Sequence, residues 1–427
     1  MTSRFFVFLL GVLPLAAQTS SVQGVITDAQ SGIVPEAVVT AINQSTSAAR
    51  KALSAGNGAY SFLQMPPGNY KISVEKPGFR TYTAEVRLQI DTPATLDVKL
   101  EVGAVTETVS VEAEATAVNT QNASVGNPFT ENQVRGLPLQ TRNVVALLSL
   151  QPGVAPDGQV LGAKADQNNV TLDGIDVNDQ QGNAGFNAVL PVPLDSVQEF
   201  RTTVAGVGAD QGRSSGGQVS LVTKGGSNQF HGSLYEFNRN TYFAANNWFN
   251  NRAGVARTPL VRNQYGASLG GRLIKNRAFF FFNWEDRKDR SGASATRTVP
   301  SETFKQGIVK VALSNGTTAD LNAADIAAVD PKGTGINSYM LDLFKQYPSG
   351  NDPKSSADGG LNFNILRFNA PQKLDNRAYV GKLDFNLDPA GKHTLMLRGT
   401  LAGNSQDSSS NLAQFPGQSS PQKTLDN

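Results

Sequence analysis

Few side chains in this sequence could catalyse a reaction or bind a metal ion. The chain has no cysteine, which excludes disulfides, thiolate metal sites and a cysteine nucleophile. His231 and His393 are its only histidines, and they stand far apart, each in a candidate strand. One or two separated histidines do not make a typical metal or catalytic site, and no HxxE or HExxH motif occurs. We therefore predict no catalytic residue, no cofactor and no metal, and a protein that is not an enzyme.

Two further patterns could bind ligands, but each has a simpler explanation. Asp173, Asp176 and Asp179 lack the order and the closing glutamate of an EF-hand, which favours turn and capping roles over calcium binding. The glycine-rich residues 206–212 do not fit a nucleotide-binding fingerprint, because a strand rather than a helix is expected after them. Charge is balanced, with 37 Lys and Arg against 35 Asp and Glu, and no basic cluster indicates nucleic-acid binding.

The first residues have the features of an export signal. Arg4 precedes the apolar residues 5–15, and the small residues Ala16 and Ala17 follow. This apolar run is too short to cross a bilayer as a helix, which needs about 20 residues. We predict a Sec signal peptide over residues 1–17, with a buried N-terminal strand as the alternative.

Residues 22–101 alternate between apolar and polar positions and are broken at short intervals by turn residues, which is typical of a small β-sandwich. Tyr60, Phe62 and Tyr70 are expected in its core. The segments GVITD, GAYSF, PPGNY and KPGF resemble the carboxypeptidase regulatory-like domain, which is not catalytic. The predicted domain covers residues 18–101.

Residues 168–238 contain the most distinctive patterns of the chain. Three β-prone runs, residues 170–175, 197–204 and 218–223, are bounded by Gly, Asn or Asp. LDGI, VQEF, SGGQVSLVTKGGSNQ and FHGS follow one another in order. Together they resemble the plug-to-barrel junction of TonB-dependent receptors of the bacterial outer membrane, and the Oar-like branch most closely. The resemblance implies a plug domain within residues 102–224, in which residues 141–150 are predicted to form a helix.

Alternating apolar and polar residues with aromatic side chains follow from residue 225 on, which indicates transmembrane β-strands. We predict strands at residues 228–238, 262–272 and 278–288, a fourth that begins near Arg377, and a fifth that ends near Thr400. Residues 289–376 would form a long excursion containing a helix at residues 339–347. The predicted fold is mainly β: a sandwich, an α+β plug, and the first strands of an antiparallel barrel over residues 225–427.

The resemblance also implies two sites. The first is a TonB box, an extended segment that suits pairing with a strand of another protein; its residues are Glu107, Thr108, Val109, Ser110, Val111, Glu112 and Ala113. The alternative is a last strand of the sandwich. The second site is the plug loop, where Asp210, Gln211 and Arg213 could contact ligand. The alternative for these residues is a flexible connector.

The expected function is energy-coupled uptake of a ligand through a plugged barrel in the outer membrane. The expected partners are a TonB-type periplasmic energiser, outer-membrane lipid, and a ligand that is a siderophore, a glycan or a peptide. The alternative is a surface or periplasmic all-β binding or adhesion protein that does not transport. Plugged barrels of this family have about 22 strands, and five are found here. We therefore expect this chain to be an N-terminal fragment of a receptor.

Overall fold

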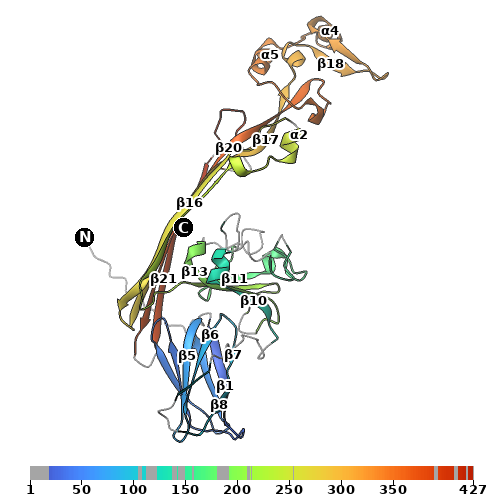
Figure 1. Ribbon diagram of the computed structural model, residues 1–427. Coiled ribbons are helices and arrows are strands. Elements are labelled where there is room, and N and C mark those ends of the chain that lie inside the picture. Colours follow the sequence, from blue (N-terminus) through green and yellow to red (C-terminus); the bar gives the residue numbers. More distant parts are fainter. Residues whose placement is uncertain are drawn as a thin grey trace, which may run out of the picture. The chain divides into compact units, whose positions relative to one another are not determined.

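The computed structural model is mainly β, as predicted, with short helices between the strands (Figure 1). It describes residues 19–103, 108–111, 123–136, 142, 150–155, 158–179, 192–208, 212, 214–252, 254–388, 393–407, 412–419 and 422–426. The predicted signal peptide and most of the predicted plug helix, residues 141–150, lie outside this part of the chain. No helix among these residues is long and apolar enough to cross a membrane.

The chain divides into two compact units. The first comprises Met1–Leu234, Ala267–Trp284 and Ala378–Leu401, and contains the sandwich, the plug sheet and segments of the long strands that follow. The second comprises Tyr235–Gly266, Glu285–Arg377 and Ala402–Asn427.

Two sheets form the predicted β-sandwich. In one, β1 pairs with β4 and also, in parallel, with the short β7 and β8, while the other has the order β3-β2-β5-β6-β9. The strands are β1 (Ser20–Asp28), β2 (Val38–Asn43), β3 (Ala49–Leu53), β4 (Ala59–Met65), β5 (Gly68–Glu75), β6 (Thr81–Leu88), β7 (Ala94–Thr95), β8 (Val98–Leu100) and β9 (Thr108–Val111).

The sandwich core follows from the alternation of its strands. In β5, Tyr70, Ile72 and Val74 are at most 3% exposed, because every second side chain of a strand points to the same face. Tyr60 and Phe62 of β4 are buried as well, as predicted. The Tyr60 hydroxyl donates a hydrogen bond to the Leu96 carbonyl oxygen at 2.7 Å, which satisfies its polar end inside the core.

The plug sheet has the order β10-β13-β14-β11-β12. Its strands are β10 (Val125–Thr130), β11 (Asn169–Leu172), β12 (Ile175–Asp176), β13 (Val197–Ala205) and β14 (Gln218–Thr223), and the helix α1 (Glu131–Gly136) follows β10. The three predicted β-prone runs correspond to β11 with β12, to β13 and to β14. All six residues of β14 are buried, the polar Gln218, Ser220 and Thr223 as well as the apolar Val219, Leu221 and Val222.

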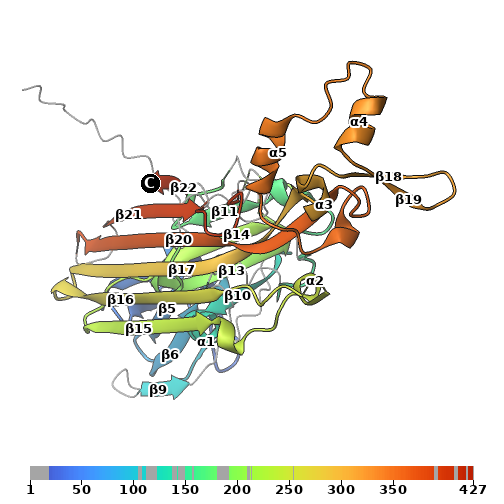
Figure 2. The ribbon, with the colours of Figure 1, turned by 90° about the horizontal axis from the view of Figure 1, so that it is seen from above.

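A six-stranded sheet follows, in the order β15-β16-β17-β20-β21-β22 (Figure 2). The strands are β15 (His231–Asn240), β16 (Leu260–Ile274), β17 (Ala278–Pro300), β20 (Phe363–Asn386), β21 (Thr394–Asp407) and β22 (Gln422–Asp426). In the described residues this sheet is open, with β15 and β22 at its two ends.

Four of the predictions for this region were wrong. β17 continues to Pro300 and β20 begins at Phe363, so the excursion between them is shorter than residues 289–376. β21 continues to Asp407, and β22 adds a sixth strand in a segment predicted to have none. His393 precedes β21 rather than lying in it. Residues 289–300 are mostly polar and show no regular alternation, although Ala295 and Val299 are buried against Leu366 and Phe368 of β20.

The excursion between β17 and β20 forms a small substructure. It contains α3 (Glu302–Lys305), the hairpin β18 (Val309–Ala312) and β19 (Thr318–Leu321), α4 (Ala323–Val329) and α5 (Ser338–Lys345). α5 confirms the helix predicted at residues 339–347. Phe304 of α3 packs against Phe344 of α5 with ring centroids 5.5 Å apart, which joins the two helices. A short helix, α2 (Trp248–Arg252), lies between β15 and β16.

Candidate functional site

The described part of the predicted box is a strand on the sandwich. Thr108–Val111 forms β9 and pairs in parallel with β6, in the register Thr81↔Thr108 to Ala84↔Val111. Glu107, Glu112 and Ala113 lie outside the described residues. The structure therefore places this backbone at the edge of a sheet, and its use as a TonB box stays a prediction.

The predicted plug-loop residues Asp210, Gln211 and Arg213 lie outside the part of the chain that the structure describes. The end of the loop is held by Asn168, a buried residue just before β11. Its amide oxygen accepts a hydrogen bond from the Gly217 backbone N–H at 2.7 Å, and its amide nitrogen donates to the Gly158 carbonyl oxygen at 2.7 Å. This side chain was not singled out in the sequence, although it opens the NNVTLDGI segment.

The buried carboxylate of Asp173 contacts both the plug and two of the long strands. Asp173 lies in the turn between β11 and β12 with a φ of 50°, and it accepts hydrogen bonds from the Thr223 backbone N–H at 3.0 Å and the Thr223 hydroxyl at 2.5 Å. It also forms ion pairs with Arg398 of β21 at 3.1 Å and with Lys382 of β20 at 3.7 Å. The turn role predicted for Asp173 is confirmed, but the ion pairs were missed.

Because these three charged side chains are buried, removing one of them is expected to lower the stability of the protein. The three side chains are 4%, 10% and 11% exposed in Asp173, Arg398 and Lys382. Removing one partner of a buried ion pair leaves an uncompensated charge and costs about 3–5 kcal/mol. Lys382 also donates to the Thr223 carbonyl oxygen at 3.2 Å, so the end of β14 is held by the same lysine. In the sequence, only the alternating polar positions of β20 and β21 indicated where partners such as Lys382 and Arg398 could lie.

The glycines that follow β14 allow the chain to pass close to the long strands. A Cβ added to Gly226 would lie 2.4 Å from the carbonyl oxygens of Gly271 and Phe280, a distance that no real side chain adopts. The VTKGG segment thus has a steric reason for its second glycine. Before it, Lys224 forms an ion pair with Glu131 of α1 at 2.8 Å.

A second buried contact joins the plug to the sandwich. Glu199 of β13 accepts a hydrogen bond from the Ile90 backbone N–H at 2.6 Å. The Arg201 guanidinium donates to the Asp91 carbonyl oxygen and to the hydroxyls of Thr92 and Ser124. Glu199 and Arg201 are each 2% exposed. Burial raises the pKa of Glu199 to about 7 and lowers that of Arg201.

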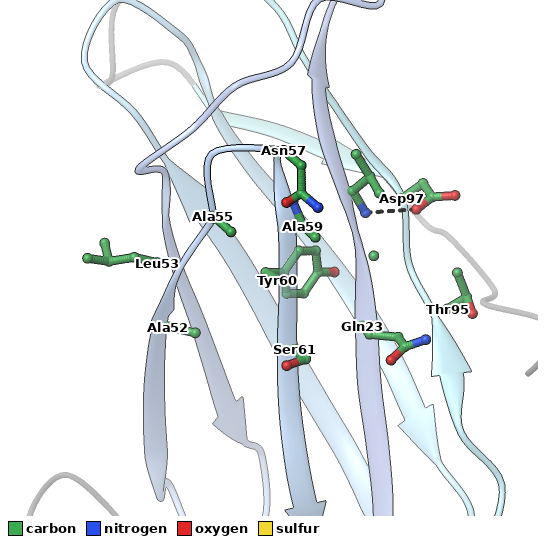
Figure 3. A pocket seen from close by; sticks show the side chains of 12 residues that line it. Gln23, Ala52, Leu53, Ala55, Asn57, Ala59, Tyr60, Ser61, Thr95 and Asp97 are labelled. Atoms are coloured by element: carbon green, nitrogen blue, oxygen red, sulfur yellow. Dashed lines mark hydrogen bonds between the residues drawn. The ribbon is translucent and has the colours of Figure 1, made fainter.

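Two further candidates from the sequence, Asp176 and His231, lie in a turn and at a strand end. Asp176 accepts from the Asn178 backbone N–H at 3.0 Å, which is a turn contact, and His231 lies exposed near the start of β15. A shallow cavity of about 600 Å³ lies on the sandwich beside Tyr60, where the Val25 N–H donates to Asp97 at 2.9 Å (Figure 3). In the described ranges no group of three or more His, Asp or Glu side chains could hold a metal ion.

Comparisons with known proteins agree with this arrangement. Residues 21–101 match the carboxypeptidase regulatory-like domain, and residues 222–426 match the outer membrane beta barrel domain. The chain is 27% identical over 292 residues to the TonB-dependent transporter Oar of Myxococcus xanthus. That match covers 62% of this chain and 26% of the relative, so the chain spans about a quarter of the length of the curated protein it matches.

Solved structures give weaker likenesses. The outer membrane transporter YddB of Escherichia coli is 14% identical with a TM-score of 0.42, over 68% of this chain and 34% of that one. A ferric enterobactin receptor of Pseudomonas aeruginosa is 11% identical with a TM-score of 0.36, over 71% of this chain and 45% of that one. Scores this low support no inference about what is bound.

The chain is similar to TonB-dependent transporters of the outer membrane, and it carries matches to a carboxypeptidase regulatory-like domain and to an outer membrane beta barrel domain. More narrowly, it is a homologue of the Oar transporter. This confirms the family predicted from the LDGI-to-FHGS segment. The relative is a transporter, in agreement with the prediction that the chain is not an enzyme.

Proposed function

We propose that this chain serves energy-coupled uptake of a ligand across the outer membrane, and that Glu107–Ala113 is the segment a TonB-type periplasmic energiser binds. The observation that carries the proposal is the placement of Thr108–Val111 as an edge strand in the register given above. An extended backbone with one neighbouring strand suits recognition by strand addition, which depends on backbone hydrogen bonds.

The proposed organisation assigns residues 1–17 to a signal peptide, 18–101 to a periplasmic sandwich, 102–224 to the box and plug, and 225–427 to the barrel. Within it, Asp173 anchors the plug to β20 and β21 through Arg398 and Lys382. The transported ligand is a siderophore, a glycan or a peptide, and Asp210, Gln211 and Arg213 are proposed to contact it.

The box is tested by removing a single backbone donor. Val109→Pro takes away one N–H from the middle of the strand, whereas Val109→Thr keeps it and keeps a β-branched side chain. Membranes that carry the full chain are titrated with the purified periplasmic domain of the energiser from the same organism. We expect the proline variant to bind about tenfold more weakly or worse, and the threonine variant to bind like the parent.

Two other results would change the proposal. Unaltered binding by the proline variant would place the energiser's contact elsewhere in the chain. Proteolysis of the sandwich in the proline variant alone would assign Thr108–Val111 to a purely structural strand.

A further inference from the structure

Aromatic and charged side chains follow one another on a single face of β17. Every second side chain of a strand points to the same face, so one face carries Phe280, Phe282, Trp284, Asp286 and Lys288. Phe282 is 45% exposed, as expected for a side chain that meets lipid. The face therefore changes from aromatic to charged within one two-residue step of the strand.

The two strands beside β17 carry the same transition. β16, β17 and β20 are neighbours in the sheet (Figure 2). On β20, Tyr379 stands one two-residue step from Arg377, and its ring centroid lies 6.5 Å from that of Phe282. On β16, the Tyr265 hydroxyl donates a hydrogen bond to Asp286 at 3.1 Å. An aromatic row at the end of an apolar band is typical of the membrane–water interface, so the charged residues beyond it are expected at the level of the lipid headgroups.

Two cations at this level share one buried carboxylate. The Lys288 ammonium lies 3.8 Å and the Arg377 guanidinium 3.7 Å from the same oxygen of Asp286, which is longer than a hydrogen bond of about 2.7–3.2 Å. The two cationic side chains are 43% and 56% exposed, whereas Asp286 is 5% exposed. Arg290 and Asp375 beside them form their own ion pair at 2.7 Å and add no net charge. The cluster thus presents net positive charge outward.

The other end of β17 lies next to the sandwich. β17 begins just after Asn276, whose backbone N–H donates to the side-chain oxygen of Asn228 at 2.9 Å. The Asn228 backbone N–H donates in turn to the Ser45 carbonyl oxygen of the sandwich at 2.9 Å. Because the sandwich is proposed to be periplasmic, the charged end of this face belongs to the outer leaflet. The glycolipid of that leaflet carries phosphate groups on its sugars, and basic clusters at a membrane surface attract such headgroups.

We propose that Lys288 and Arg377 bind a phosphate group of an outer-leaflet glycolipid, and that Asp286 and Tyr265 hold the two cations in place. A phosphate monoester carries a charge of about −1.5 to −2 near pH 7, which complements the positive cluster. The guanidinium can form paired hydrogen bonds to phosphate, and the ammonium binds it as a point charge. Both cations reach the same Asp286 oxygen, so one phosphate can contact both. This inference rests on the proposed function for its placement in the outer membrane, but not on the TonB box.

Lipid binding by the full chain, extracted from outer membranes in mild detergent, tests the site. Lys288→Gln with Arg377→Gln removes both cations, and Lys345→Gln with Lys354→Gln removes the same charge from exposed positions in the excursion. Each protein is titrated with lipid A that carries two phosphates and with its dephosphorylated form, and lipid adducts are measured by native mass spectrometry. We expect parent and control to bind the phosphorylated lipid alike, and the Lys288 and Arg377 double variant to bind it roughly tenfold more weakly.

A second variant should change binding in the opposite direction. Asp286→Asn keeps an acceptor for the Tyr265 hydroxyl and removes the negative charge that competes with the phosphate. We expect it to bind the phosphorylated lipid roughly two- to fivefold more tightly, the effect of one exposed charge pair. Weaker binding by this variant would overturn the electrostatic account of the site.

Three other results would also count against the proposal. Equal binding of the two lipids, or equal binding by the parent and the double variant, would overturn the site. Displacement of the lipid by inorganic phosphate would show a site for free phosphate and overturn the lipid assignment. Lipid binding that persists in Val109→Pro while the energiser no longer binds supports both proposals, and lipid binding with an energiser that ignores the proline overturns the box alone.

Discussion

The sandwich and the plug bury different kinds of side chains. The sandwich core consists of apolar residues and three tyrosines, of which Tyr60 and Tyr70 donate their hydroxyls to backbone carbonyl oxygens. The plug buries charges: Asp173 against Arg398 and Lys382, and Glu199 beside Arg201. Apolar burial gives stability that depends little on partners or pH. Buried charges depend on each partner, so the stability of the plug should respond to single substitutions at these positions and to pH.

The largest effect should follow from removing the carboxylate at the plug junction. Asp173→Ala leaves Arg398 and Lys382 buried without their counter-charge, and we expect a loss of about 3–5 kcal/mol in plug stability. Urea-dependent proteolysis of the plug in the full chain measures it. Asp176→Ala, which removes the turn contacts to Asn178, is the matched control and should cost about 1 kcal/mol. Equal losses in the two variants would show that the ion pairs do not hold the plug.

The next effect concerns pH. Burial raises the pKa of Glu199 from 4.5 to about 7 in the folded protein, so the folded state binds the proton more tightly than the unfolded state. Its contribution is fully present below pH 4.5 and is lost as pH rises through about 7, a change of roughly 3 kcal/mol. Glu199→Gln keeps an acceptor for the Ile90 N–H but does not titrate. We therefore expect the free energy of unfolding of the parent to fall, relative to that of the variant, as pH rises from 4.5 through about 7.

Thermal unfolding at pH 4.5 and pH 8 makes this comparison. If the free energy of unfolding changes equally with pH in parent and variant, the pKa of Glu199 is not raised by burial. The plug and the sandwich would then not differ in pH dependence at this contact.

The smallest effect should come from the sandwich core. Ile72→Val removes one methylene from a fully buried side chain, and we expect a loss of about 0.5–1.5 kcal/mol. The loss should be the same at low and high salt and across pH 4.5–8, because no charge is involved. Denaturant unfolding followed by tyrosine fluorescence measures it. A loss that varies with salt would show that the sandwich too is held by charge.

The sequence predicted best what depends on local pattern. The sandwich alternation, β14 and α5 were all found, because period-2 and helical spacing appear within a few residues. The partners of Asp173 could not be found, since Lys382 and Arg398 lie more than 200 residues away and only the fold brings them together. The Glu199 contact was missed for the same reason, as Ile90 is 109 residues distant. The ends of β17 and β20 were missed because their few buried apolar residues, such as Val299 and Phe368, are separated by polar residues and pack together only in the fold.

The central proposal is that an energiser engages the Thr108–Val111 strand of this chain, and cross-linking in living cells tests it most directly. Because the chain lacks cysteine, Ser110→Cys provides a single reactive site. In cells that also produce the energiser with a cysteine in its strand-binding region, we predict a disulfide-linked adduct of the two proteins that disappears when Val109→Pro is added. Absence of any adduct, with the chain present in the outer-membrane fraction, would contradict the account.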